Sequence, residues 1–236
     1  MLVKPICLLL LFFLGASLFL ASTASATPVL YDWSANINGA TFNPPALPGS
    51  VDSTGFDFAT GLGTMTMTFA AGTHYGGVYL NIYFDSGLGF VSDAYGAVGG
   101  AASSLESYQL ADPNLGQLWL NFVNNALDGT NTVSTYSPPG PPPGACCDVG
   151  LALIRRVTVN AGNTGSLTFV IGTSQPSSGF FLMETSHDSG ETVYLSESFT
   201  QSEGPQPAIP EPATWLLMSS GVVLLALSRR KKQSKQ

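Results

Sequence analysis

The chain has 236 residues, enough for one domain or two small ones, with 44% hydrophobic and only 10% charged residues. Between Thr27 and Glu211 the basic residues are Arg155 and Arg156, set against all fifteen acidic residues, so this stretch has a formal net charge of −13 and no lysine. Such a surface repels phosphate backbones, and we therefore expect no nucleic-acid partner.

Residues 1–26 have the three parts of a secretory signal peptide. Lys4 supplies a positive charge, residues 6–20 are apolar but too short to span a bilayer comfortably, and Ala24 and Ala26 provide the small side chains that signal peptidase requires. We predict cleavage after Ala26, with cleavage after Ala24 as the alternative. A signal peptide implies passage through the Sec translocon across the inner membrane.

The body, residues 27–201, contains short runs in which apolar and polar residues alternate. This period is typical of half-buried strands, and turn signals such as Asp128-Gly129 separate the runs. About ten short strands predict an all-β fold, an antiparallel β-sandwich of jelly-roll type. A short helix is compatible with residues 105–110. The clearest runs are 65–69, 78–84, 118–122, 151–159, 167–171 and 193–195.

Three further segments interrupt this pattern. The proline-rich stretch 137–144 cannot donate ladder hydrogen bonds, and we interpret it as a long loop on one domain rather than a boundary between two half-domains. Cys146 and Cys147 are adjacent, a spacing that rarely forms a disulfide, so the rare ring between them, pairing with another molecule and free thiols all remain open. Residues 202–209 are expected to form an extended spacer.

No catalytic motif is present in the sequence, so we expect no enzyme and predict neither catalytic nor metal-ligating residues. His74 and His187 each lie beside turn residues and are interpreted as solvated loop histidines. A secreted hydrolase would need paired carboxylates, and a calcium site would need regularly spaced acids, which the sequence does not show. Calcium is therefore an alternative, and no other cofactor is expected. The carboxylates considered for a hydrolase are Asp57, Asp85, Asp93 and Glu184.

Three aromatic residues are candidates for carbohydrate contacts. Tyr79 and Tyr83 fall on the polar phase of the run 78–84, and Trp119 falls on the polar phase of the run 118–122. Exposed aromatic rings on sandwich domains often stack on sugars, although packing against a loop or the second sheet explains them equally simply.

The C-terminus has a second apolar stretch, residues 213–228, followed by a basic tail, residues 229–236. Sixteen helical residues span about 24 Å, which is short for a transmembrane helix. Trp215 is placed as an interfacial residue would be, and the cations hold the tail in the cytoplasm, so we expect the body on the far side of the inner membrane. The cations expected to flank this anchor are Arg229, Arg230, Lys231 and Lys232.

Pro210-Glu211-Pro212 lies directly before the apolar stretch. Two prolines hold this tripeptide extended, the shape that proteases favour. The order of this tripeptide, a short apolar helix and a basic tail, over residues 210–232, resembles the PEP-CTERM sorting signal of exported proteins from Gram-negative bacteria that also make exopolysaccharide. The resemblance implies recognition by an exosortase, a membrane-embedded cysteine protease.

We therefore expect a protein held briefly in the inner membrane with its body in the periplasm, then delivered to the outer surface or the medium. The expected role is structural or adhesive in the exopolysaccharide or biofilm layer, with exopolysaccharide as a further partner. The alternatives are a carbohydrate-binding module for that polymer and a secreted hydrolase.

Overall fold

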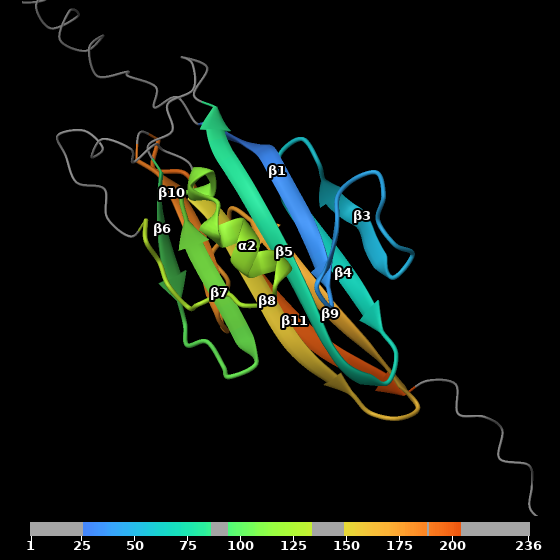
Figure 1. Ribbon diagram of the computed structural model, residues 1–236. Coiled ribbons are helices and arrows are strands. Elements are labelled where there is room, and N and C mark those ends of the chain that lie inside the picture. Colours follow the sequence, from blue (N-terminus) through green and yellow to red (C-terminus); the bar gives the residue numbers. More distant parts are fainter. Residues whose placement is uncertain (1–25, 86–93, 134–148, 188, 204–236) are drawn as a thin grey trace, which may run out of the picture.

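The computed structural model describes residues 26–85, 94–133, 149–187 and 189–203, which form two antiparallel sheets packed face to face (Figure 1). This confirms the predicted all-β sandwich. A jelly roll has eight strands in two Greek keys, so these eleven strands form a larger sandwich than that type. Sheet A has the order β2 (Ala40–Phe42), β1 (Thr27–Ile37), β5 (Gly72–Asp85), β8 (Val149–Val159) and β7 (Glu106–Ala111). Sheet B has the order β3 (Val51–Asp57), β4 (Leu62–Phe69), β9 (Asn163–Gly172), β11 (Thr192–Glu203), β10 (Phe181–Ser186) and β6 (Ala94–Gly99).

The predicted alternation places the core between the sheets. On β4, Met65 and Met67 are fully buried, while Thr66 faces away and its hydroxyl lies 3.0 Å from that of Thr168 on β9. On β5, Leu80 is likewise buried. Because side chains on a strand alternate between faces, a period of two in the sequence is enough to assign these inward positions.

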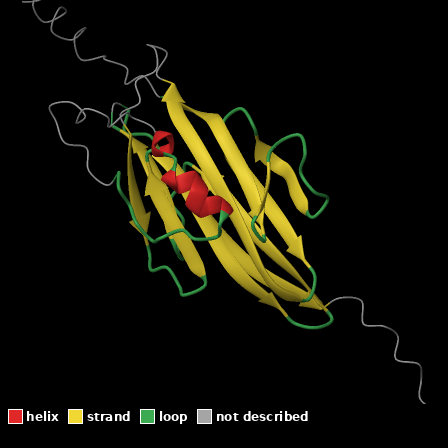
Figure 2. Ribbon diagram, in the orientation of Figure 1, coloured by secondary structure: helices red, strands yellow, loops and turns green. Residues whose placement is uncertain are grey.

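The strand predicted over residues 118–122 is wrong. Residues Gln117–Val123 form the helix α2, preceded by the 3-10 turn η1 (Pro113–Leu115), whose N-cap Asp112 accepts a 2.8 Å hydrogen bond from the Asn114 N–H. Leu118 and Phe122 lie one helical turn apart and are both buried against sheet A. Figure 2 shows α2 lying across the outer face of this sheet.

Two further expectations need correction. Residues 105–110 do not form a helix, because Glu106–Ala111 is the edge strand β7 and pairs with β8. The body also extends two residues beyond its expected end at 201, since β11 continues to Glu203 and pairs there with Asn163. Local propensity leaves helix and strand both open for residues 105–110, and pairing with β8 favours the strand.

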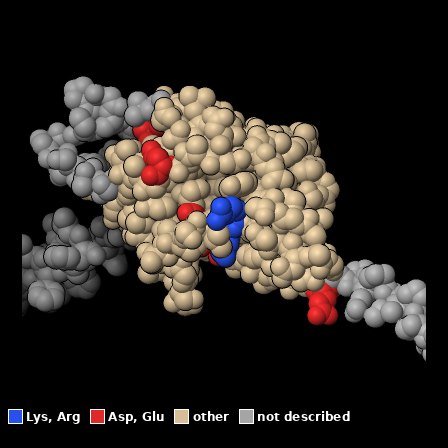
Figure 3. All heavy atoms as spheres, turned by 60° about the horizontal axis from the view of Figure 1, so that its bottom comes forward, with Lys and Arg blue, Asp and Glu red and all other residues tan. Residues whose placement is uncertain are grey.

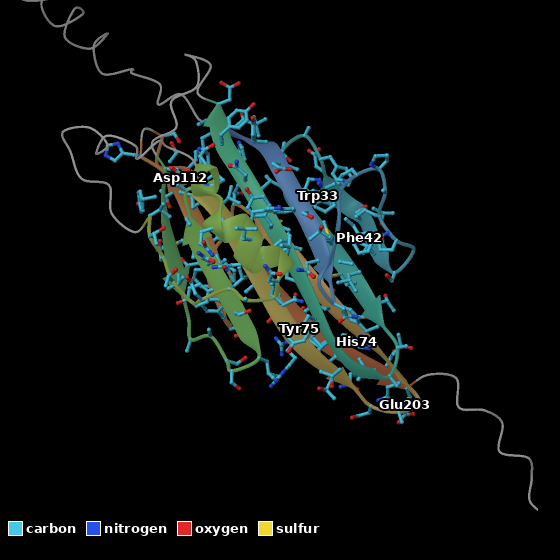
Figure 4. The ribbon with its side chains drawn as sticks, viewed as in Figure 1. Trp33, Phe42, His74, Tyr75, Asp112 and Glu203 are labelled. Atoms are coloured by element: carbon cyan, nitrogen blue, oxygen red, sulfur yellow. The ribbon has the colours of Figure 1, made fainter. Side chains whose placement is uncertain are left out.

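The chain enters and leaves the sandwich at opposite ends. Thr27 begins β1 at one end, and Glu203 ends β11 at the other (Figures 1 and 4). The fourteen residues of β5 give this long axis a length of about 45 Å. In the ranges that the structure describes, no helix is long and apolar enough to cross a membrane.

Gly63 is expected to be indispensable for the pairing of β3 with β4. Its φ is +123°, and a Cβ built there would overlap the carbonyl oxygen of Gly55. We expect Gly63→Ala to lower the free energy of unfolding by at least about 2 kcal/mol in urea denaturation. Gly172→Ala is the matched control, since Gly172 has open space around it and lies on the neighbouring strand β9. Equal effects of the two substitutions would contradict this assignment.

Candidate functional site

The aromatic residues predicted to contact carbohydrate lie on the outer face of sheet A, but they do not form one surface. Tyr79 is only 5% exposed, because its ring packs under α2 at 5.6 Å from Trp119 and 6.0 Å from Phe122. Tyr83 is half-buried farther along β5, with its ring centroid 6.4 Å from that of Tyr31. The structure thus joins Tyr79 to Trp119 and pairs Tyr83 with a residue that the sequence analysis did not single out.

Helix α2 buries this part of the outward face. The Asn36 side-chain N–H donates a 2.6 Å hydrogen bond to the Phe122 carbonyl, and Asn121 donates a 2.9 Å bond to Gln109 on β7. Asn36 is fully buried as a result. Tyr79 points away from the core, as the alternation predicts, and the helix then covers it. A contact between Tyr79 and a sugar is therefore not available in this structure.

Tyr31, Phe58 and Tyr75 are exposed aromatic residues that the sequence analysis did not single out. The register of β1 against β5 shifts between Leu30 and Asp32, so that Tyr31 is an extra residue with a 74% exposed side chain. Phe58 is 43% exposed in the turn between β3 and β4. The break in alternation at Tyr31-Asp32-Trp33 is the only signal in the sequence that could have indicated the bulge.

A cluster of charged side chains joins the two sheets. Arg155 on β8 places Nη1 3.3 Å from a carboxylate oxygen of Glu106 on β7 and also pairs with Glu197 on β11, with its guanidinium 5.9 Å from the centre of the Phe199 ring. The Glu197 side chain is 2% exposed and that of Glu106 9%. On the face drawn in Figure 3, basic side chains form one small blue patch with acidic red beside it.

The two carboxyls of this cluster have opposite pKa shifts. Burial, together with a hydrogen bond that the protonated group donates to Glu106, raises the pKa of Glu197 to about 7. Burial also opposes ionisation of Glu106, but hydrogen bonds from Glu197 and Ser103 and the charge of Arg155 outweigh it and lower that pKa. Below about pH 7 the cluster therefore holds one proton between two carboxyls beside one cation. Because its two glutamate side chains are buried between the sheets, we interpret the cluster as a structural link between sheet A and sheet B.

The carboxylates considered for a hydrolase do not come together. Asp57 lies on β3 and Glu184 on β10, four strands apart in sheet B, which is about 19 Å. Asp57 accepts hydrogen bonds of 2.9 Å from the Ala59 N–H and the Thr60 hydroxyl, so its carboxylate stabilises the turn between β3 and β4. Asp85 ends β5 in sheet A, and Asp93 lies outside the described residues.

His74 is not the solvated loop residue that we expected. It lies within β5, its ring stacks on Phe69 at 5.1 Å, and its Nδ1 and Nε2 lie 3.3 Å from Asn38 Nδ2 and 3.0 Å from the Ala70 carbonyl oxygen. Because the Asn38 amide donates, Nε2 carries the proton. Figure 4 places His74 toward the end of the sandwich where Glu203 lies. His187 is exposed in the turn after β10, as predicted.

Within the described ranges, no group of three or more His, Cys, Asp and Glu side chains could hold a metal ion. Calcium therefore stays a prediction with no assigned residues.

The C-terminal segment is the part of the chain that matches a known family. Residues 208–232 match the PEP-CTERM protein-sorting motif. The chain carries a PEP-CTERM sorting motif. The match includes Pro210, Glu211 and Pro212, the apolar stretch and the first cations of the tail, as the sequence analysis predicted. No curated protein and no solved structure matches the chain.

The PEP-CTERM motif implies an exported protein that passes through the membrane and is processed by exosortase. The motif, the anchor 213–228 and the basic tail lie outside the described residues, as do Ala24, the proline-rich stretch 137–144 and the two adjacent cysteines. Ala26 is described and is 4% exposed, packed against the core. Cleavage after Ala24 would keep this contact, and cleavage after Ala26 would remove it.

Proposed function

We propose that this protein is an exported surface or extracellular-matrix component that exosortase sorts, with a structural or adhesive role in the exopolysaccharide layer. The PEP-CTERM motif at residues 208–232 is the observation that carries the proposal. A signal peptide at residues 1–26 would direct the body across the inner membrane, and the basic tail at 229–236 would stay in the cytoplasm, which fits the same route.

The sandwich supports this role by its position relative to the motif. Six residues separate Glu203, the last residue of β11, from Pro210, and a chain of that length reaches no more than about 25 Å. The folded body thus stays close to the membrane until the chain is cut. The end of the sandwich opposite Glu203 is then the one directed away from the membrane.

The mass of the mature protein tests the sorting proposal. In cells with exosortase, we expect intact-mass spectrometry to find a body that has lost residues 229–236. In a strain without exosortase, the tail is expected to remain. Retention of the full tail in both strains would refute the proposal.

Carbohydrate binding is a second candidate function. The observation in its favour is the 74% exposed ring of Tyr31, which lies against Tyr83 on a described strand pair. A secreted hydrolase has no comparable support, since Asp57 and Glu184 lie four strands apart.

A further inference from the structure

The outer surface around the bulge of β1 presents an aromatic ring that the fold does not bury. Tyr31 is 74% exposed, the largest exposed fraction among the large hydrophobic side chains of the described residues. Its ring meets that of Tyr83 edge to face, at 6.4 Å and 67°. A bulge bends its strand locally and re-aims a side chain, so the direction of the Tyr31 ring is set by backbone geometry and by one partner ring.

A second exposed ring is held beside the same bulge. The Leu30 N–H donates a 3.1 Å hydrogen bond to the Ala59 carbonyl, which ties the turn between β3 and β4 to β1. Tyr31 and Phe58 each lie one residue from this bond. The Phe58 ring leans on the buried Trp33 at 5.4 Å and 33°, so the exposed ring rests on a rigid base.

Polar groups accompany these rings. The Asp32 carboxylate is exposed beside Tyr31, with one oxygen accepting a 2.8 Å hydrogen bond from the Trp33 N–H. Asn81 lies directly opposite Asp32 on β5 but is only 4% exposed, so the accessible polar group beside the rings is the Asp32 carboxylate. Apolar rings with a few fixed polar groups are what a sugar requires, since its C–H faces stack and its hydroxyls bond.

The charged residues near the rings indicate whether a bound polymer would be charged or uncharged. The described cations are Arg155 and Arg156, and Arg156 pairs in register with Tyr75, eight residues from Tyr83 along β5, or about 27 Å. Asp32 lies much nearer, so an anionic polymer would be repelled. We propose that Tyr31, Phe58 and Tyr83, with Asp32, form a binding surface for an uncharged glycan.

A protein partner fits this surface less well. Stable protein interfaces bury about 800 Å² on each side around an apolar centre. The other exposed large hydrophobic side chains of the described residues are spread over β5, β6, α2, β9 and the loop before β7. These residues are Tyr75, Val98, Leu105, Leu120 and Val170.

The inference names the ligand class and the contact residues for the second candidate function and rests on the extracellular location proposed above. The test uses full-length protein purified in detergent and three probes: dextran and xylan as uncharged polymers and alginate as a polyanion. We expect binding to at least one uncharged polymer, weakened about tenfold or more by Tyr31→Ala and by Phe58→Ala. Tyr75→Ala is the matched control, being an exposed tyrosine at the far end of β5, and it should bind as the unsubstituted protein does.

Binding that survives Tyr31→Ala and Phe58→Ala, binding to alginate alone, or binding to none of the three polymers would overturn the inference. Thermal melts of each variant show whether a loss of polymer binding comes from unfolding. Tyr31→Phe keeps the aromatic ring and should retain binding; if it loses binding while it stays folded, the inference fails. A protein that is trimmed by exosortase but binds no uncharged polymer overturns the glycan inference alone. One that binds but keeps its tail overturns the sorting proposal alone.

Discussion

Replacing Pro210, Glu211 and Pro212 together with alanine is expected to leave the protein full-length and attached to the inner membrane. The substitution removes the fixed backbone angles and the single charge that mark the segment for exosortase, while the anchor and the basic tail stay intact. We expect nearly all of the protein to move from the released or surface fraction to the inner-membrane fraction, measured by fractionation and intact mass.

The control for this variant lies a few residues upstream. Pro205 and Pro207 belong to the same proline-rich approach but fall outside residues 208–232. Replacing both with alanine should leave processing unchanged. If the Pro210–Pro212 variant loses its tail normally, or if the control keeps its tail to the same extent, exosortase does not recognise the motif.

Glu197→Gln is expected to stabilise the protein at alkaline pH. Because the folded state holds the Glu197 proton more tightly than the unfolded state does, this carboxyl stabilises the fold below about pH 4.5, and the contribution is lost as pH rises through about 7. Glutamine imitates the protonated form at every pH. We expect it to raise the free energy of unfolding at pH 8 by about 1–3 kcal/mol and to flatten the dependence of stability on pH between 5 and 8.

Two control variants separate the causes of this effect. Glu106→Gln removes the carboxylate charge that opposes ionisation of Glu197, so the pKa of Glu197 should fall only in part, because burial, its largest cause, remains, and the change in stability near pH 7 should become smaller without disappearing. Glu203→Gln, at the exposed end of the same strand, should leave the pH profile as it is. A Glu197→Gln variant that follows the original pH profile in urea titrations would contradict the assignment.

The sandwich could be predicted from the sequence because burial between two sheets imposes a period of two, which the runs on β4, β5, β8 and β9 display directly. The run 118–122 shows why this signal fails for short segments. Leu118, Leu120 and Phe122 alternate, but Leu118 and Phe122 are also spaced by one helical turn, and burial of that face against sheet A favours the helix.

The candidate surfaces were harder to predict because they depend on contacts between distant residues. Tyr79 is on the outward phase of its strand, but nothing local indicates that α2 will cover it. The pairing of Glu106 with Glu197 spans 91 positions and becomes visible only once folding brings both side chains to Arg155 on β8. The sorting motif was predictable for the opposite reason, since its three parts are contiguous in the chain.

The location of the body tests the central claim most directly. Alkaline phosphatase, which folds only where disulfides form, is fused after Glu203 in one protein and after Gln236 in another. We predict high phosphatase activity in cells for the first fusion and none for the second, because the sandwich is exported and the basic tail is retained. An inactive fusion after Glu203, with the protein present in the cytoplasm, would contradict the account.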